Sequence, residues 1–532
     1  MVKKIDKVLE KSFFHWNNNN LNEAKFYLNK ALKLDPANSK ILFYKGTIEL
    51  QTENLLGGIE FLEKAYALNS NDIDIKINFS NALINYSNSL IQQNDLVQAE
   101  SVLKNAVGVH SENETAYLNL LKLLLQNQNF SEIDNLLTSI KSNNFNNAEI
   151  YYILGNSYFD QKNYIEAIKY FDNALLINPN YKECIFHKAL SNEFLGNFDE
   201  AMKLYDFCFS IDPNYDLALF NKALILLSKD NFKVGWDLYK YRWSSQKFRD
   251  KYLVTSKPKL LKENKNSKIF VWAEQGLGDQ ILFSSVINDF SKIYPNLIVS
   301  IDKRLIPLFS RSFPSFEFVD KDIYFPEENY DYHIPLGDIP SFVRLEIKDF
   351  ISQKTQFIYS DKATTNEFKK SLSVNKKPIC GLSWTSKNNS YGNSKSIKLD
   401  ELAIFLEKKD FNYINLEYID SSEELSSVEK KYGFKINKVD SVDKFNDIDQ
   451  LCSLISACDI VITISNVTAH LSGAMGVKTF LLAPYGYGRL WYWNDEGVSK
   501  WYPSVSIIRQ TDQNQWLKTF EVLDREMKLI GF

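Results

Sequence analysis

Hydrophobic and polar positions follow two different periods in the two halves of the chain. In the first half, small and large apolar residues recur at the spacing of an amphipathic helix. From Lys268 onward, short continuous apolar runs alternate with helical patterns, which is typical of βαβ units around a parallel sheet. The pattern therefore predicts an α plus α/β protein, with an all-helical half followed by a half built on parallel strands.

The helical half is internally repetitive. One copy, residues 155–179, ends in a proline, and the same small and aromatic slots recur about 34 residues later. Further copies lie towards the N-terminus, and one near residues 133–140 is degenerate. The interval from Gly58 to Ala99 is about seven residues too long for the period, so we expect two extra helical turns or a longer loop there. The slots are filled by Ala24, Leu28, Ala31, Gly46, Gly58, Leu62, Ala65, Ala99, Leu103, Ala106, Ile133, Leu137, Ile140, Gly155, Tyr158, Ala167, Phe171, Ala174, Ala189, Ala201, Tyr205 and Cys208.

This pattern resembles the tetratricopeptide repeat (TPR) over residues 1–245, with about six to seven copies. Small residues let paired helices approach closely, and the prolines end the second helix of a pair. The resemblance implies a solenoid whose concave surface binds a protein or an extended peptide. In the last copy, Trp236, Tyr239 and Trp243 lie at helical spacing. They are expected to form the joint with the second half, or alternatively a patch that binds an acceptor.

The second half divides into two α/β lobes. Residues 246–267 are predicted as a linker, 268–375 as the first lobe and 376–532 as the second. Because ligands of open α/β sheets bind at the carboxyl ends of the strands, the chemistry is expected in the cleft between the lobes. The predicted strands are Ile269–Ala273, Leu297–Ile301, Phe316–Val319, Tyr332–Pro335, Ile379–Trp384, Tyr413–Glu417, Asp459–Ile464 and Thr479–Ala483.

Composition narrows the class of protein. A chain of 532 residues is expected to form two to four domains, and its net charge of −4 gives no reason to expect nucleic acid or membrane partners. The five cysteines are scattered without a CxxC spacing, which fits a reducing compartment. No stretch has the length of a signal peptide core or of a membrane-spanning helix, so a cytoplasmic protein is expected.

A glycine turn joins the first predicted strand of the first lobe to a helix. The segment KIFVWAEQGLGDQILF, residues 268–283, reads as strand, turn and helix, and Asp279 stands where the helix begins. Such a turn suits a phosphate or a sugar, and Asp279 adds a carboxylate that either acts as a base or caps the helix. Glu274 and Gln275 flank the turn and are candidates to orient an acceptor, although Glu274 serves equally well in a salt bridge.

A second helix start follows a buried strand in the second lobe. Residues 465–470 read Ser-Asn-Val-Thr-Ala-His and open a helix rich in small residues, whose N-terminus is an anion site. Asn466 and Thr468 place an amide and a hydroxyl beside it. His470 is expected either to contact phosphate or to brace the loop. The aromatic residues that follow, Trp491, Trp493, Trp501 and Tyr502, are expected to wall the cleft or to seal the interface between the lobes.

The order of several motifs resembles the TPR-linked bacterial glycosyltransferases related to glycosyltransferase family 9, the heptosyltransferase family. The motifs are AEQGLGDQI (273–281), GLSWTSKN (381–388), KSIKLDEL (395–402), CDIVITISNVTAHLSGAMGV (458–477) and WYPS (501–504) followed by Arg509-Gln510. The resemblance implies a two-lobed, Rossmann-like GT-B module. Its first lobe would bind the acceptor and its second lobe a nucleotide sugar, with no metal and no cofactor.

Carried over residue by residue, the resemblance assigns roles to the candidates. Asp279 is the base, with Glu274, Gln275, Gly276 and Gly278 on the acceptor side. Donor binding falls to Lys395, Glu417, Ser465, Asn466, Thr468 and His470. Lys395 fills a basic slot that meets the donor phosphates, or alternatively is an exposed loop lysine. Ser465 stands where the family often has an acidic residue, a departure that puts the ribose or base contact in doubt.

Three functions remain open from the sequence. The first is an inverting, metal-independent glycosyltransferase whose repeats recruit a protein or glycan acceptor. The second is a protein glycosyltransferase similar in architecture to the O-linked N-acetylglucosamine transferases, which also join TPRs to a GT-B core. The third is a TPR scaffold whose GT-B half has lost activity.

Overall fold

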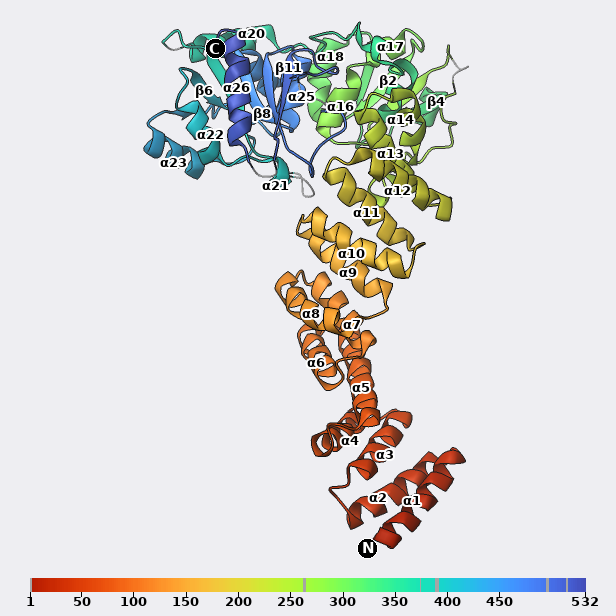
Figure 1. The fold of residues 1–532 in the computed structure, drawn as a ribbon. Helices are drawn as coiled ribbons and strands as arrows, with labels where there is room; N and C mark the ends of the chain where they lie inside the picture. Colours follow the sequence, from red (N-terminus) through yellow and green to blue (C-terminus); the bar gives the residue numbers. More distant parts are fainter. Residues whose placement is uncertain (1, 262–264, 374, 388–391, 494–496, 513–514) are drawn as a thin grey trace. The chain divides into compact units, whose positions relative to one another are not determined.

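The computed structural model describes residues 2–261, 265–373, 375–387, 392–493, 497–512 and 515–532 (Figure 1). The chain divides into two compact units, Met1–Leu195 and Gly196–Phe532. The boundaries proposed from the sequence at residues 245, 267 and 375 stay predictions. Part of the predicted linker, residues 262–264, lies outside the described residues.

The first unit is a solenoid of helices packed in consecutive pairs, as the repeats predict. The helices are α1 (Val2–Asn17), α2 (Leu21–Leu34), α3 (Ser39–Gln51), α4 (Leu55–Leu68), α5 (Ile73–Gln92), α6 (Leu96–Val109), α7 (Glu114–Gln126), α8 (Phe130–Asn143), α9 (Ala148–Asp160), α10 (Tyr164–Ile177) and α11 (Lys182–Phe194). The repeat positions Ala24, Ala65, Ala106 and Ala174 are fully buried. Close approach also explains Gly46, where an added Cβ would lie 3.0 Å from the carbonyl oxygen of Gly58.

Helix α5 accounts for the long interval in the repeats. It has 20 residues, whereas α3 and α7, which occupy the same place in their pairs, have 13 each. The prediction of two extra helical turns is confirmed. The Asp72 side chain caps α5 by accepting hydrogen bonds from the backbone N–H groups of Asp74 and Ile75.

The second unit begins with the last helices of the array. These are α12 (Phe198–Ile211), α13 (Asp216–Ser228), α14 (Phe232–Tyr239), the 3₁₀ turn η1 (Lys240–Ser244) and α15 (Gln246–Arg249). Phe232, Trp236 and Tyr239 of α14 belong to the same buried cluster as the core of both sheets. Among the described residues, the largest buried cluster of this unit therefore includes the end of the repeats together with residues of both sheets.

The first lobe contains a parallel sheet in the order β3-β2-β1-β4 among the described residues. Its strands are β1 (Ile269–Trp272), β2 (Leu297–Ile301), β3 (Glu317–Asp320) and β4 (Tyr332–Pro335). One face packs on α16 (Leu277–Ser284), α17 (Ile287–Ser291) and α18 (Ile306–Ser312). Beyond β4, the Lys259 backbone pairs with His333, so part of the predicted linker extends the sheet.

The second lobe contains a sheet in the order β10-β11-β9-β8-β5-β6-β7 across its described residues. All its pairs are parallel except β10 with β11. The strands are β5 (Ile379–Ser383), β6 (Asn412–Asn415), β7 (Ile436–Asn437), β8 (Ile460–Ile464), β9 (Thr479–Ala483), β10 (Gly497–Val498) and β11 (Val505–Arg509). The helices include α20 (Lys362–Leu372), α21 (Gly392–Lys395), α22 (Leu399–Leu406), α23 (Ser422–Tyr432), α24 (Ile448–Ser456), α25 (Val467–Ala474) and α26 (Leu517–Leu529).

All eight strands predicted from the sequence are present, with shifts of one or two residues at some ends. The sequence reasoning missed β7, β10 and β11. In both sheets the strand that comes first in the chain is flanked on each side by later strands. The order of strands thus reverses beside β1 in the first lobe and beside β5 in the second, and ligands bind at such points in open α/β sheets.

Candidate functional site

The candidate site lies where the carboxyl ends of β5, β6 and β8 converge. Glu417 follows β6, is 3% exposed, and its carboxylate accepts hydrogen bonds from the backbone of Trp384 and from the backbone and hydroxyl of Thr385. Ser383 donates a further one at 3.2 Å. Burial raises the pKa of Glu417, while these donors pull it back down. Glu417 therefore braces the loop after β5, and it also lines a polar cavity of about 240 Å³ at this edge of the sheet.

Asn466 connects this loop to helix α25. Its side-chain oxygen accepts from the backbone N–H of Ala469, which makes it the N-cap of α25. Its amide nitrogen donates to the Ser383 hydroxyl at 2.7 Å and to the Thr385 carbonyl at 3.2 Å. The loop after β5 and the start of α25 are thus fixed relative to each other.

Ser465 carries an unsatisfied polar group in this region. Its side chain is 4% exposed, and its buried hydroxyl has no hydrogen-bond partner among the described residues. Buried hydroxyl groups are paired in most proteins, because an unpaired one costs free energy. Together with the buried Thr468, it marks the N-terminus of α25 as a place with free hydrogen-bonding capacity.

His470 is buried and neutral. Its Nδ1 lies 2.9 Å from the Tyr502 hydroxyl, and its ring packs against Tyr492, Trp493 and Tyr502. Burial, reinforced by the charge of nearby Lys395, lowers the pKa of His470 to about 3. These contacts match the alternative in which His470 braces the loop.

Lys395 ends helix α21 and is 4% exposed. The alternative that it is an exposed loop lysine is therefore wrong. Its methylene chain lies beside Gly488, and its charge acts on His470. Residues 388–391 of the loop that precedes it, including Asn388 of one motif, lie outside the described residues.

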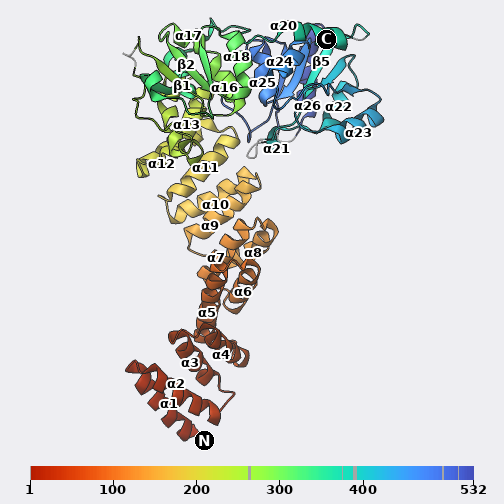
Figure 2. The same cartoon turned by 180° about the vertical axis from the view of Figure 1, so that it is seen from behind.

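Asp279 lies in the first turn of helix α16 and faces the second lobe. One carboxylate oxygen accepts from the Gly276 backbone N–H at 3.2 Å, and the other lies 3.4 Å from the Tyr492 hydroxyl. The capping alternative is thus confirmed for one oxygen. Beside it, an added Cβ on Gly278 would lie 2.8 Å from Cδ2 of His470. Helices α16 and α25 lie side by side in both ribbon views (Figures 1 and 2).

Glu274 and Gln275 have partners within the chain. Glu274 is 3% exposed and forms an ion pair of 3.0 Å with Arg242, which comes from the end of the repeat helices and is fully buried. Arg242 also pairs with Asp338, after β4, at 2.7 Å. Gln275 donates to the Tyr239 hydroxyl at 3.0 Å. The salt-bridge alternative for Glu274 is confirmed, and this network occupies the point where the strand order reverses in the first sheet.

The sequence reasoning missed Arg242, Asp338 and Tyr492. The available signal for Arg242 was a charged residue among closely spaced aromatic ones, Tyr239 and Trp243. Its guanidinium packs 4.6 Å from the Tyr239 ring and 4.4 Å from the Trp243 ring.

Aromatic side chains close the joint between α14 and the two lobes. Trp236 donates to the Arg344 carbonyl at 2.8 Å and meets Trp491 edge to face, with ring centres 5.4 Å apart. Trp501 meets Phe350 in the same way at 4.9 Å. These contacts confirm the joint that the sequence predicts, and they match the alternative in which the second-lobe aromatics seal an interface.

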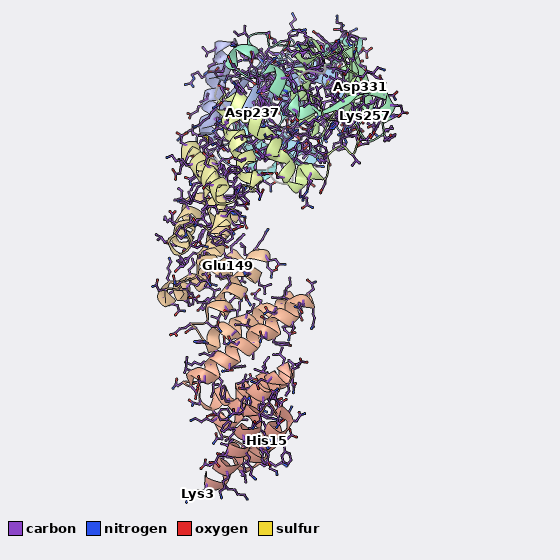
Figure 3. The ribbon with its side chains drawn as sticks, turned by 90° about the vertical axis from the view of Figure 1, so that its right-hand side faces the viewer. Lys3, His15, Glu149, Asp237, Lys257 and Asp331 are labelled. Carbon is purple, nitrogen blue, oxygen red and sulfur yellow. The ribbon has the colours of Figure 1, made fainter. Side chains whose placement is uncertain are left out.

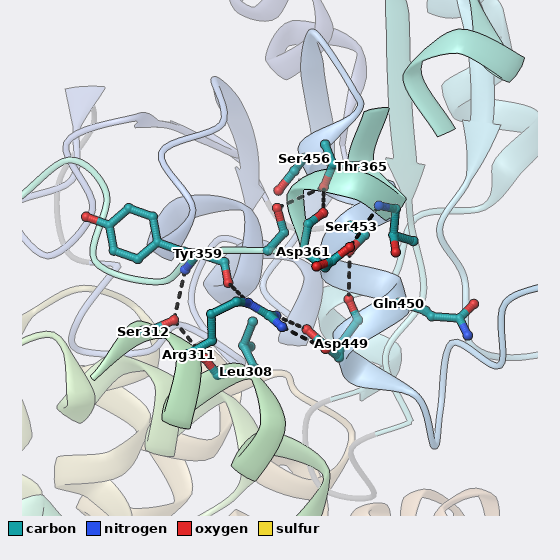
Figure 4. A network of polar contacts seen from close by, with 12 residues as sticks. Leu308, Arg311, Ser312, Tyr359, Asp361, Thr365, Asp449, Gln450, Ser453 and Ser456 are labelled. Atoms are coloured by element: carbon teal, nitrogen blue, oxygen red, sulfur yellow. Dashed lines mark hydrogen bonds and ion pairs between the residues drawn. The ribbon is translucent and has the colours of Figure 1, made fainter. Parts of the chain in front are cut away.

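A polar network also joins the lobes (Figure 4). Arg311 of α18 donates to the carbonyl of Tyr359 at 2.8 Å and forms an ion pair with Asp449 of α24. Tyr359 donates its backbone N–H to the hydroxyl of Ser312 at 2.9 Å. The ion pair is partly exposed, so it contributes modestly to stability.

The described residues contain no group of His, Cys, Asp and Glu side chains arranged to hold a metal ion. Nor do they include a helix with the length and hydrophobicity needed to cross a membrane.

Comparison with known proteins identifies the repeats. One tetratricopeptide repeat profile matches residues 148–181, and a second matches residues 9–38 and 183–215. Protein FlbA of Caulobacter vibrioides is 26% identical over 298 residues, which are 52% of this chain and 46% of FlbA. The chain thus matches less than half the length of this relative. The helical half is a solenoid of tetratricopeptide repeats, and such repeats favour a role as a protein-interaction scaffold.

Several solved structures of TPR proteins are similar to part of this chain. YrrB, described as a TPR protein with an unusual peptide-binding site, is 21% identical, covering 35% of this chain and 93% of YrrB with a TM-score of 0.30. The C-terminal part of a TPR protein from Cytophaga hutchinsonii is 16% identical, with coverages of 45% and 95% and a TM-score of 0.32. The TPR2AB domain of yeast Sti1 is 16% identical, with coverages of 46% and 91% and a TM-score of 0.23.

Proposed function

We propose that residues 268–532 form a GT-B glycosyltransferase module that moves a sugar from a nucleotide-sugar donor to an acceptor recruited by, or near, the repeats. One observation carries the proposal. The first turn of α16, which holds Asp279, and the N-terminal half of α25 each follow the carboxyl end of a parallel strand, and they meet where Gly278 lies against His470. A carboxylate and an anion site that face each other across two lobes are the parts that glycosyl transfer needs.

The donor half of the proposal rests on the start of α25. The helix dipole and its free N–H groups favour a diphosphate there, and the buried Lys395 supplies a positive charge nearby. The unpartnered hydroxyl of Ser465 gives the nucleotide sugar a hydrogen-bond partner that the chain itself leaves unused.

In the proposed inverting reaction, Asp279 takes the proton of the acceptor hydroxyl. The acceptor oxygen then forms a bond to the anomeric carbon as the bond to the diphosphate breaks, and the negative charge of the leaving group is held at α25. His470, neutral at working pH, braces this site and takes no part in proton transfer. Because the family resemblance implies no metal, turnover is expected to persist in EDTA.

The contact between Gly278 and His470 has a consequence for this mechanism. It leaves no space for a substrate between the Gly278 backbone and the His470 ring, so the lobes have to separate before both substrates bind. The partly exposed pair of Arg311 and Asp449 is a contact that such a movement would break.

The acceptor is proposed to be a protein or a glycan. Tetratricopeptide repeats favour a protein or peptide partner, which supports a protein glycosyltransferase similar to the O-linked N-acetylglucosamine transferases. A scaffold without activity is the second candidate. It is favoured by the same closed contact at Gly278 and by the engagement of both Asp279 oxygens.

Turnover separates the two candidates. The purified protein is first screened for thermal stabilisation by a panel of nucleotide sugars, since a ligand of the native state raises apparent stability. Asp279→Asn is then expected to lower kcat by about 10²–10⁴-fold while nucleotide affinity is kept. Asp361→Asn is the matched control, because Asp361 also caps a helix, α20, and lies outside the proposed site. Turnover of Asp279→Asn at the wild-type rate refutes the base.

Calorimetry with UDP, GDP and ADP tests the donor site independently. Thr468→Val and Lys395→Met are expected to weaken nucleotide binding, with Thr479→Val as a buried control on strand β9 of the same sheet. Equal affinities in all three variants count against the assignment. A wild-type protein that binds none of the nucleotides and shows no turnover supports the scaffold.

A further inference from the structure

The first sheet has one face without a long helix on it. On β1, Ile269 and Val271 point into the main core, whereas Phe270 and Trp272 belong to a separate small cluster with Ile298 and Tyr330. Irregular backbone covers this second face, from the segment 251–258 on one side and the loop 321–330 on the other. Lys257 and Asp331 mark this edge of the sheet in Figure 3.

A cavity of about 220 Å³ lies under this cover, at the carboxyl ends of β1 and β2. Phe270, Trp272 and Ser300 line its inner part and are each 5% exposed or less. It is smaller than the 300–1,000 Å³ that is usual for pockets binding drug-sized ligands, so it suits a single ring or side chain.

The rim of the cavity is apolar and open to solvent. Val254 is 95% exposed, Tyr324 78% and Ile323 67%, and all three line the cavity. Exposed apolar side chains around a cavity are typical of a protein-binding site. In such a site one side chain of the partner is buried in the cavity, and its neighbours contact the rim.

The polar groups of the cavity distinguish between classes of ligand. Glu327 accepts from the backbone and hydroxyl of Ser256, the Tyr330 hydroxyl bonds Thr255 at 2.9 Å, and Lys321 pairs with Asp322 at 2.7 Å. In contrast, Ser300 is 5% exposed and its hydroxyl makes no hydrogen bond to another described residue. The cavity thus offers one hydroxyl, that of Ser300, which no other described residue pairs with.

This inventory disfavours a sugar and favours a phenol. A sugar ring carries hydroxyl groups around its edge, and each would need a partner when buried, at a cost of about 1–3 kcal/mol where none is found. A tyrosine side chain buries an apolar ring and brings one hydroxyl, which Ser300 can meet. At the rim, the ammonium group of Lys251 has no ion pair with a described carboxylate, so an acidic neighbour in the partner would complement it.

We infer that this cavity binds a tyrosine side chain of an extended polypeptide, with an acidic residue beside it. The inference does not depend on glycosyl transfer, because it concerns a separate pocket of the first lobe and predicts binding without turnover. It gives the α/β half a contact of its own with a protein partner, in addition to the repeats.

Saturation-transfer NMR with the full chain tests the inference, with acetyl-Asp-Tyr-amide as the probe. The phenol ring is expected to receive saturation, acetyl-Asp-Ser-amide to receive none, and methyl β-glucoside not to compete. Ile323→Asp is expected to weaken binding by about fivefold or more, through the loss of apolar contact and the added negative charge. Ile351→Asp is the matched control, because Ile351 is 87% exposed and does not line the cavity.

Reversing the charge at Lys251 tests the acidic neighbour independently. Lys251→Glu is expected to weaken acetyl-Asp-Tyr-amide and to favour acetyl-Lys-Tyr-amide, and thermal unfolding shows whether each variant is folded. Equal signals in wild type and Ile323→Asp, or displacement of the dipeptide by methyl β-glucoside, overturn the inference. Both rim positions are exposed, so a failure to fold is not expected to obscure the result.

Discussion

Replacing Arg242 by methionine is expected to destabilise the second unit by about 3–5 kcal/mol. Arg242 is fully buried and pairs with Glu274 at 3.0 Å and with Asp338 at 2.7 Å. Removing one partner of a buried ion pair costs about this much, because the remaining charge is left without compensation in the interior. Asp338 keeps Lys259 as a partner at 2.6 Å, so the cost falls mainly on Glu274.

The destabilisation is expected to depend on pH. Burial already raises the pKa of Glu274 with Arg242 in place, and without the guanidinium that pKa rises further. A carboxyl group whose folded-state pKa is raised destabilises the fold as pH rises through that range, because the unfolded chain ionises more easily. Relative to wild type, Arg242→Met is therefore most destabilised near pH 8 and less so near pH 5.

Tryptophan fluorescence during urea unfolding measures this effect. Eight of the nine tryptophans lie in the second unit and the ninth is Trp16, so the signal reports on the unit that contains Arg242. Arg249→Met, at an exposed position of α15, is the matched control and should stay within about 0.5 kcal/mol of wild type. A loss below about 1 kcal/mol for Arg242→Met at pH 8, or the same loss at both pH values, would refute the reasoning.

Three further predictions follow from buried contacts. Gly278→Ala places a Cβ 2.8 Å from the His470 ring and should cost about 1–3 kcal/mol in urea, whereas Gly108→Ala, where an added Cβ meets nothing within 4 Å, should not destabilise its unit. Burial lowers the pKa of His470 to about 3, so between pH 6.5 and pH 5 the unfolded chain binds a proton at this residue and the folded chain does not. The free energy of unfolding of the second unit should therefore fall by about 2 kcal/mol over this range. A His470→Gln variant that loses as much stability over the same range would contradict this. Glu49→Gln leaves the buried Lys45 without its carboxylate partner and should destabilise the first unit by about 3–5 kcal/mol. The exposed Glu60→Gln should destabilise it by less than about 0.5 kcal/mol. Thermal unfolding followed by circular dichroism measures both, and similar losses in the two variants would contradict the role given to burial.

The sequence predicts those parts of the fold that depend on local patterns. Continuous apolar runs such as Ile460–Ile464 identify central parallel strands, because both of their faces are buried. The repeat period even predicts the extra length of α5 from the interval between Gly58 and Ala99. Strand β11 was missed, although residues 505–508 are buried. Its run of apolar residues is interrupted by Ser506, and it directly follows the WYPS motif (501–504), which was interpreted only as part of the family resemblance.

Partners at long sequence separation could not be predicted. Glu274 lies 32 residues from Arg242 and 63 from Gly337, so its ion pair has no local signature. Lys395 stands in a polar stretch typical of exposed loops, yet tertiary packing buries it beside Gly488. The same holds for Ser465, whose missing hydrogen-bond partner is a property of the folded site.

The burial of Arg242 and Trp236 restricts how the array can change its length during evolution. Duplication or loss of a helix pair among α1–α11 keeps the same repeat-to-repeat contacts, because each pair packs on its neighbours. Loss of α13 and α14 would remove side chains that lie in the same core as the sheets, and a helix pair inserted after them would separate α14 from its contacts there. Relatives of this chain with more or fewer repeats are therefore expected to differ before α12 and to keep the last pair in place.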